Sequence, residues 1–325
     1  MRVRSHCLEL AVVTTFACFA SCTAVAQTYP IKAVRVIVAS GPGGQTDTTA
    51  RLVTVKLSQT LGQPFIVENM GGAGGNLGVM TVARAAPDGY TLLAVGSSIA
   101  ISGSLNAKLP YDPVNDFAPI SLLNSSPHVL VIHPSIPATS VNELVALAKA
   151  NPGKYSYSSA GPGTPAHLAG ELFKLAFGVD IIHVPFKGGG LGVASTRGGH
   201  TSMAVTALPT GVNYVRDGSL RALAMFSSKR ASALPNVPTM LEATGQDLPA
   251  DIVNGFMAPA KTPRAIIDTL HRELAKAMAA PDTRERLATM GFDPVAGTPE
   301  EFASWIKTDM ARWGKVVRDA KITAD

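Results

Sequence analysis

The chain has 325 residues, of which 46% are hydrophobic and 16% are charged, and its formal net charge is +5. This length allows one large domain or two, and it buries enough surface to fold without disulfides. The basic residues are scattered, with no Lys/Arg run and no aromatic interleaving, which excludes nucleic-acid binding. A mildly positive surface favours an anionic small ligand.

The first 26 residues have the organisation of a secretory signal peptide. A positive n-region precedes the apolar segment 10–20, and Ala24-Val25-Ala26 is a small-x-small cleavage site. We predict cleavage after Ala26, so that the mature chain begins at Gln27. Residues 19–22 loosely resemble a lipoprotein box, which leaves lipid attachment at Cys22 as an alternative. All three cysteines precede Gln27, so no disulfide, thiol nucleophile or Cys-type metal site is expected in the mature protein.

Short apolar runs then alternate with segments of helical spacing. Strands are predicted at 34–39, 65–68 and 90–95, and helices at 46–61 and 77–85. Glycine and proline mark each junction between a strand and the following helix. This β-α-β-α-β order predicts a parallel sheet with helices on both faces.

A second α/β unit is predicted over residues 128–249. The elements expected there are a helix capped by Ser140 and Glu143, strands at 155–158 and 181–184, a helix at 165–177, and a strand at 220–226 that returns toward the first unit. The remainder is predicted to be helical, with Thr262 and Thr298 as N-caps before proline. The predicted fold class is therefore α/β with two lobes, residues 27–127 plus 250–325 forming lobe 1 and residues 128–249 lobe 2. No later apolar run reaches eighteen residues, so we expect a soluble mature protein.

Two glycine-rich loops are candidate ligand sites because each joins the end of a strand to the start of a helix. The first runs from Ser40 to Asp47, with Asp47 expected as the N-cap or first-turn acid. In open α/β sheets ligands bind beyond the carboxyl ends of the strands. The amides and dipole of a helix N-terminus favour an anion there. A tight turn before a capped helix explains the same residues without a ligand.

The second loop runs from Ser158 to His167, with Thr164 as N-cap and Pro165 as the first helical residue. Free amides and the hydroxyls of Ser158, Ser159 and Thr164 suit a carboxylate. A well-capped helix without a ligand is the alternative. The matching loop in the other lobe favours ligand binding.

Two further segments are less specific. The glycine-rich segment 71–78 lacks the G-x-G-x-x-G spacing and a following acid, so close packing or a cleft wall is favoured over nucleotide binding. Lys187 either contacts an anion at the cleft or is solvated. No H-E-x-x-H or G-x-S-x-G motif and no metal-ligand spacing of histidines is present, so we expect neither catalysis nor a metal or cofactor. A secreted hydrolase stays a remote alternative.

Short motifs along the whole mature chain resemble the tripartite tricarboxylate transporter substrate-binding proteins, the Bug-type receptors. The matching pieces are Tyr29-Pro30, Val34–Val38, Pro42-Gly43-Gly44 with Asp47 and Ala50-Arg51, Leu61–Pro64, Val67–Asn69, Gly72–Gly75, Pro87–Leu92, Tyr111-Asp112-Pro113 with Asp116-Phe117, Ser159–His167 with Gly170-Glu171, Pro185–Gly188, Leu220–Ala224, Val237–Thr239 and Ala258-Pro259. Their order and number carry the resemblance.

The resemblance implies a type II periplasmic binding protein fold, in which two lobes joined by two crossing segments close around an organic acid. It implies that the loops Ser40–Asp47 and Ser158–Thr164 grip a carboxylate from opposite lobes. The chain departs from the family's usual residues at Phe186, Ser195, Ser202, Thr206 and Ala207, which leaves the ligand specificity of lobe 2 open.

We therefore expect a monomeric periplasmic receptor that captures a small organic carboxylate for the membrane subunits of a transporter. Docking on a sensor kinase ectodomain is the alternative, because both functions use the same pocket. The candidate ligand-binding residues are Ser40, Gly41, Gly43, Gly44, Thr46, Asp47, Ser98, Ser158, Ser159, Ala160, Gly161, Thr164, His167, Phe186 and Lys187.

Overall fold

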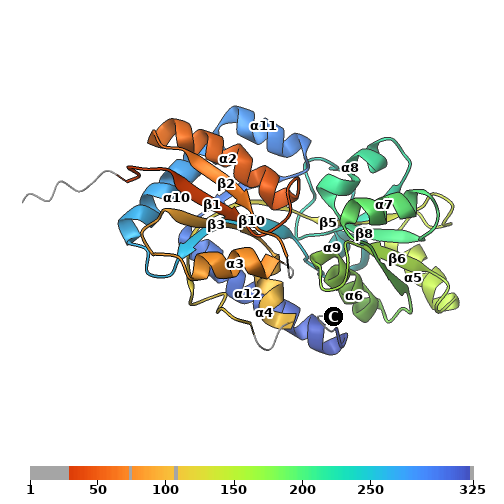
Figure 1. The fold of residues 1–325 in the computed structure, drawn as a ribbon. Coiled ribbons are helices and arrows are strands. Elements are labelled where there is room, and N and C mark those ends of the chain that lie inside the picture. Colours follow the sequence, from red (N-terminus) through yellow and green to blue (C-terminus); the bar gives the residue numbers. More distant parts are fainter. Residues whose placement is uncertain (1–28, 73–74, 106–108, 323–325) are drawn as a thin grey trace, which may run out of the picture.

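The computed structural model describes residues 29–72, 75–105 and 109–322, and it contains two β-sheets with helices packed on them (Figure 1). The predicted signal peptide, the start at Gln27 and the alternative lipid site Cys22 lie outside these residues. No helix in the described part of the chain is long and apolar enough to span a membrane.

The first sheet is six-stranded, with strand order β11-β4-β10-β3-β1-β2. Its strands are β1 (Val34–Val38), β2 (Phe65–Asn69), β3 (Thr91–Gly96), β4 (Phe117–Ser126), β10 (Ile252–Pro259) and β11 (Asp293–Gly297). Strand β1 pairs in parallel with β2 and β3, which confirms the predicted β-α-β-α-β unit. Strands β10, β4 and β11 extend the sheet in antiparallel pairs, so the sheet is mixed rather than parallel throughout.

Helices cover both faces of this sheet because β1 buries alternate side chains on opposite sides. Val34 and Val36 pack in one cluster with α2 (Gln45–Leu61) and α10 (Arg264–Ala279), whereas Ile37 packs with α3 (Asn76–Ala83) and α12 (Pro299–Asp319). The helices α4 (Ser98–Leu105) and α11 (Pro281–Thr289) complete this part.

The second sheet is five-stranded, with strand order β7-β6-β8-β5-β9. Its strands are β5 (His128–Ile132), β6 (Ser156–Ser159), β7 (Ile182–Pro185), β8 (Met203–Ala207) and β9 (Arg221–Phe226), and its helices are α5 (Val141–Ala150), α6 (Pro165–Phe177), α7 (Gly189–Arg197), α8 (Leu208–Arg216) and α9 (Met240–Thr244). Strand β6 is parallel to β7 and β8, so these three strands end at the same edge.

The strand predicted at 220–226 was expected to return toward the first lobe, and the structure agrees. This strand, β9, is an edge strand of the second sheet that pairs antiparallel with β5, so that its last residue, Phe226, lies opposite His128 at the start of β5. The chain then enters the first sheet with β10, which lies between β3 and β4. Both strands are buried apolar runs, and apolar patterning alone does not say which sheet a strand joins.

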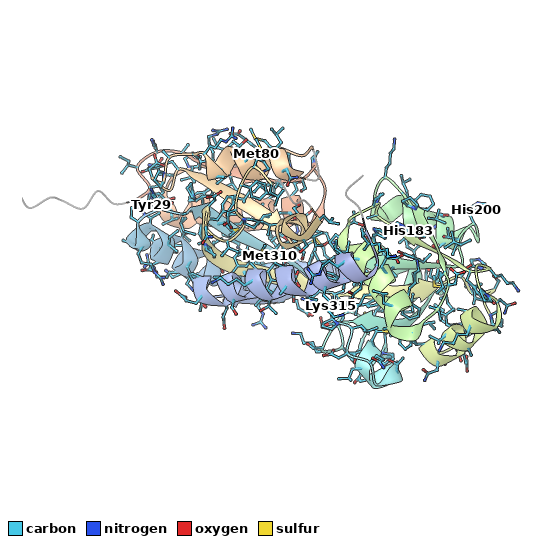
Figure 2. The ribbon with its side chains drawn as sticks, turned by 90° about the horizontal axis from the view of Figure 1, so that it is seen from below. Tyr29, Met80, His183, His200, Met310 and Lys315 are labelled. Carbon is cyan, nitrogen blue, oxygen red and sulfur yellow. The ribbon has the colours of Figure 1, made fainter. Side chains whose placement is uncertain are left out.

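Within the described residues the chain crosses between the two sheets twice, and one helix packs against both. Only Pro127 separates the end of β4 from the start of β5, and the chain crosses back between β9 and β10. Helix α12 runs along the molecule from one sheet to the other (Figure 2). Its residues Trp313, Val316 and Val317 belong to the hydrophobic core of the second sheet. The predicted lobe boundaries stay a prediction, and the end of α12 packs across them.

The predicted N-caps have different outcomes. Thr298 caps α12 in a full capping box with Glu301. Thr262 does not cap α10, which begins at Arg264 with Pro263 as its N-cap. The Thr262 hydroxyl instead donates to the carbonyl of Pro259 at 2.8 Å, because the chain turns tightly after β10.

Candidate functional site

In each sheet the parallel strands end at one edge and are followed there by helix N-termini. In the first sheet β1 and β3 lead into α2 and α4. In the second sheet β6, β7 and β8 lead into α6, α7 and α8. These edges hold the two predicted loops, and the amides of helix first turns have no partner within their own helix.

Asp47 organises the first loop. Its carboxylate accepts hydrogen bonds from the amide of Gly43 at 2.8 Å, the Arg51 guanidinium at 3.1 Å and the Asn69 amide at 2.9 Å. Asp47 is 3% exposed, in the first turn of α2, and the N-cap residue is Gly44. The structure thus places Asp47, predicted as a ligand residue, in a position where its carboxylate holds the loop.

The pKa of Asp47 is lowered. Burial acts to raise it, but the hydrogen bonds from Arg51, Gly43 and Asn69, together with the Arg51 charge, outweigh burial. Asp47 is therefore ionised at neutral pH. Because the Gly43 amide already donates to the Asp47 carboxylate, the amides that can donate to an anion in this loop are those that follow Gly44.

A chain of buried polar side chains anchors α2 to the sheet. Thr46 Oγ1 donates to Asn254 Oδ1 at 2.8 Å, Asn254 Nδ2 donates to Asn124 Oδ1 at 2.8 Å, and Asn124 Nδ2 donates to Thr49 Oγ1 at 2.9 Å. The Thr46 proton is used inside the protein, so Thr46 has its backbone amide to offer a carboxylate. Sequence analysis missed Asn124, which stands near the serines at the end of β4, and Asn254, which is the polar residue of an otherwise apolar β10.

The remaining residues predicted in this lobe lie on the same edge. The loop residues Ser40, Gly41 and Gly43 are exposed or half-buried. The N-cap of α2 is Gly44, so no side chain caps this helix. Ser98 is half-buried at the first position of α4, after β3. The structure therefore brings the predicted residues of lobe 1 together around two helix N-termini.

The serines of the second loop have internal partners. Ser158 is fully buried, and its hydroxyl donates to the Gly192 carbonyl at 3.0 Å, which ties β6 to α7. Ser159 Oγ accepts from the Gly161 amide at 3.1 Å and lies 2.7 Å from His183 Nε2. Neither hydroxyl is directed freely at the cleft. Both shape the loop instead.

Thr164 has the predicted role of N-cap of α6. Its hydroxyl donates to the Gly161 carbonyl at 2.7 Å and accepts from the His167 amide at 3.4 Å. His167 Nδ1 accepts from the Gly163 amide at 3.0 Å, which places the imidazole proton on Nε2. His167 thereby fixes the loop through one nitrogen and leaves the other as a donor.

Below this loop, three aromatic rings form a stack. The ring centroids of His167 and His183 lie 4.0 Å apart, and the two ring planes are inclined by 7°. The Tyr157 ring is also stacked on His183, with the centroids 4.8 Å apart. Figure 2 shows His183 in the second lobe. Burial, and then the neighbouring His167, lower the pKa of His183 to about 4. The stack is therefore uncharged at neutral pH and supports the loop.

Ser159 and His183 form a serine–histidine pair that no sequence motif indicated, and such a pair is found in hydrolases. Ser159 is 2% exposed, which denies a substrate access to its oxygen. Within the part of the chain that the structure describes, no carboxylate hydrogen-bonds His183. A nucleophilic serine requires both access and an oriented base, and this pair has neither.

Phe186 and Lys187 follow β7 and lie against the second loop. The Phe186 amide donates to the Ser159 carbonyl at 3.2 Å, and the Gly188 amide donates to the Ala160 carbonyl at 3.2 Å. Phe186 is half-buried and Lys187 is exposed. The structure thus brings all predicted residues of lobe 2 to one edge.

A groove of about 460 Å³ lies between the two sheets' edges. Its lining comes from α2, α8 and the end of α11: Gly43, Gln45, Thr48, Pro209, Thr210, Val212, Asn213, Arg216, Thr289, Met290 and Phe292. Arg216 is the charged side chain of this lining. A larger hollow of about 630 Å³ lies between α2 and α11 and touches the candidate site at Gly43 and Asp47. The smaller groove joins both lobes, and of the predicted ligand residues only Gly43 lies in its lining.

The chain is similar to known proteins over almost its whole length. Residues 49–322 match the tripartite tricarboxylate transporter family receptor. Protein BugT of Bordetella pertussis is 38% identical over 314 residues, covering 95% of this chain and 96% of BugT.

Solved structures are similar to this chain over most of its length as well. An R. palustris protein with adipate is 31% identical, with a TM-score of 0.81, covering 91% of this chain and 99% of that one. MatC from Rhodopseudomonas palustris with bound malate is 32% identical, with a TM-score of 0.77, covering 89% and 100%. The fold is the two-lobed fold of periplasmic binding proteins, and the family and these neighbours are solute-binding proteins rather than enzymes. The chain therefore belongs to the tripartite tricarboxylate transporter family receptors of the Bug type.

Proposed function

We propose that this protein is a monomeric periplasmic receptor that binds a small organic carboxylate between its lobes and delivers it to the membrane subunits of a tripartite tricarboxylate-type transporter. The observation that carries the proposal is that the parallel strands of both sheets lead into helix N-termini, α2 and α4 in one lobe and α6 in the other, and that residues of both lobes line one groove. Two relatives solved with adipate and malate support a carboxylate as ligand.

The binding chemistry follows from what the internal hydrogen bonds leave free. Asp47, Ser158 and Thr164 are engaged in shaping the two loops. The donors that remain are the first-turn amides of α2, the Ala166 amide of α6 and the Nε2 proton of His167, because Pro165 has no N–H and the His167 amide donates to Thr164. Amides at a helix N-terminus bind a carboxylate through hydrogen bonds and through the helix dipole.

Lobe closure couples binding to transport. A ligand gripped from one side by α2 and from the other by α6 makes more contacts when the lobes approach, so it favours the closed state by that difference alone. A membrane partner that recognises the closed state then accepts loaded receptors. A sensor kinase ectodomain would use the same signal, and no residue described here favours it.

The test is a thermal-shift screen of the purified mature protein against organic acids, with matched uncharged amides as controls. A ligand that binds only the folded state raises the melting temperature by mass action. At a ligand concentration a hundredfold above the Kd, the free energy of unfolding increases by about 2.7 kcal/mol. We expect carboxylates to raise it and amides not to. A screen in which no carboxylate raises it contradicts the proposed function.

A further inference from the structure

The last residue of α4 reaches across to the second loop. Helix α4 follows β3 of the first sheet and ends at Leu105, whereas Gly163 lies in the turn between β6 and α6 of the second sheet. A Cβ built on Gly163 would lie 2.9 Å from Leu105 Cδ1, which is closer than van der Waals contact allows. The Leu105 side chain therefore fills the space that a side chain at position 163 would need.

Helix α4 is held firmly by its own lobe. The Ser104 hydroxyl donates to the carbonyl of Met310 on α12 at 3.0 Å (Figure 2). A Cβ on Gly103 would lie 2.7 Å from Met310 Cε, so the two helices are in close contact. Leu105 is half-buried and packs, like Ile101, against the hydrophobic core of the second sheet. Helix α4 thus presents Leu105 to the second loop from a fixed position.

The glycine that Leu105 contacts also orients a ligand donor. The Gly163 amide donates to His167 Nδ1 at 3.0 Å, and this bond leaves the imidazole proton on Nε2. Gly163 has a φ of +67°, which glycine adopts without strain. Because Gly163 has no side chain of its own to pack, a neighbouring group is needed to restrict its backbone. Leu105, from the other lobe, is such a group.

We infer that Leu105 is a positioning residue: when the lobes close around a ligand, its side chain packs on Gly163 and fixes the turn that orients His167. The inference rests on the proposed function, because it presupposes carboxylate binding and lobe closure. Leu105 does not touch the ligand in this account and acts through Gly163 and His167. The fraction of molecules in which this contact is made then sets the apparent affinity.

A double-mutant cycle tests the contact, with calorimetric titration of the carboxylate that gives the largest thermal shift. Leu105→Ala removes the packing on Gly163 and should weaken binding about five- to tenfold, because fewer molecules reach the competent state. Gly163→Ala directs a Cβ against Leu105 and should weaken binding further. The same substitution should cost at least about threefold less affinity in the Leu105→Ala background, where the space is vacant. Strain at the positive φ is equal in both backgrounds, so the cycle cancels it.

A spectroscopic readout separates positioning from general stability. The nitrogen NMR shifts of the His167 ring report which nitrogen carries the proton. In the ligand-bound wild type we expect the proton on Nε2, and in Leu105→Ala we expect a mixture of tautomers. Leu105→Met conserves the side-chain volume and should restore both affinity and tautomer. Leu77→Ala is the matched control, because Leu77 is 53% exposed on α3 of the same lobe, and it should leave both unchanged.

Urea unfolding of the four proteins in the cycle completes the test. Additive effects on affinity overturn the positioning role, even where the two substitutions are coupled in the free energy of unfolding, because the contact then only supports the fold. An unchanged His167 tautomer in Leu105→Ala overturns it as well. Failure of every carboxylate to bind the wild type is a different result, seen before any variant is made, and it overturns the proposed function itself.

Discussion

Replacing Asp47 by Asn tests whether its carboxylate organises the first loop. The carboxylate is buried and accepts from Gly43, Arg51 and Asn69, and an amide of the same shape turns an NH₂ group toward one of these donors. The Arg51 side chain is 52% exposed, so its ion pair contributes at most about 1 kcal/mol. The Gly43 and Asn69 donors are part-buried, and leaving one of them without an acceptor costs about 1–3 kcal/mol. We expect a total loss of about 2–4 kcal/mol in the free energy of unfolding.

The pH dependence gives this prediction a sign. The folded pKa of Asp47 lies below its ordinary value, so its contribution is present above the unfolded pKa of about 3.9 and disappears as pH falls below that. Urea unfolding at pH 7, 5 and 3 should show the wild type and Asp47→Asn converging at low pH. The control is Asp268→Asn, which breaks an exposed i,i+4 ion pair with Arg264 and should cost less than about 0.5 kcal/mol. A loss at Asp47 no larger than at Asp268 refutes the reasoning.

Three other variants test separate parts of the account. Thr164→Val removes an N-cap side chain whose hydroxyl already donates to the Gly161 carbonyl. It should lower the free energy of unfolding in urea by about 1 kcal/mol and change carboxylate affinity by less than about threefold. A tenfold loss of affinity would show instead that the hydroxyl contacts the ligand. Gly170→Ala lies in a helix, where alanine ordinarily stabilises by about 1 kcal/mol, but its Cβ would lie 2.2 Å from the Tyr157 ring, so we expect a lower melting temperature; a higher one contradicts the packing. Burial lowers the pKa of His128 to about 4, so the free energy of unfolding should fall by about 3 kcal/mol as pH falls from about 6.5 to 4. In urea titrations at each pH, His128→Gln should show a weaker dependence of this free energy on pH, and an unchanged dependence counts against the prediction.

Much of the fold was predictable because, along the first half of each lobe, the spacing of apolar residues and the positions of turn residues indicate the same strands and helices. Helix 165–177, with a Thr-Pro start and a glycine after its end, is observed at its predicted bounds. Helix α7 was missed because three of its first four residues are glycines, which have poor helix propensity. It forms because Val193 and Thr196 are buried against the second sheet.

The candidate site was predictable in place but not in chemistry. Glycine-rich segments after strands located both loops, and each loop joins the end of a strand to the N-terminus of a helix. Local sequence did not reveal that Asp47 and Ser158 are engaged internally, because their partners Asn69 and Gly192 lie 22 and 34 residues away.

Calorimetric titration with a carboxylate and with its carboxamide tests the central claim most directly. The two ligands share size and shape, but the carboxamide lacks the charge that helix N-termini attract and places an NH₂ group against amide donors. We expect the carboxylate that gives the largest thermal shift to bind at least a hundredfold more tightly than its amide. Equal affinities, or no heat with any carboxylate, would contradict an anion grip built from α2 and α6.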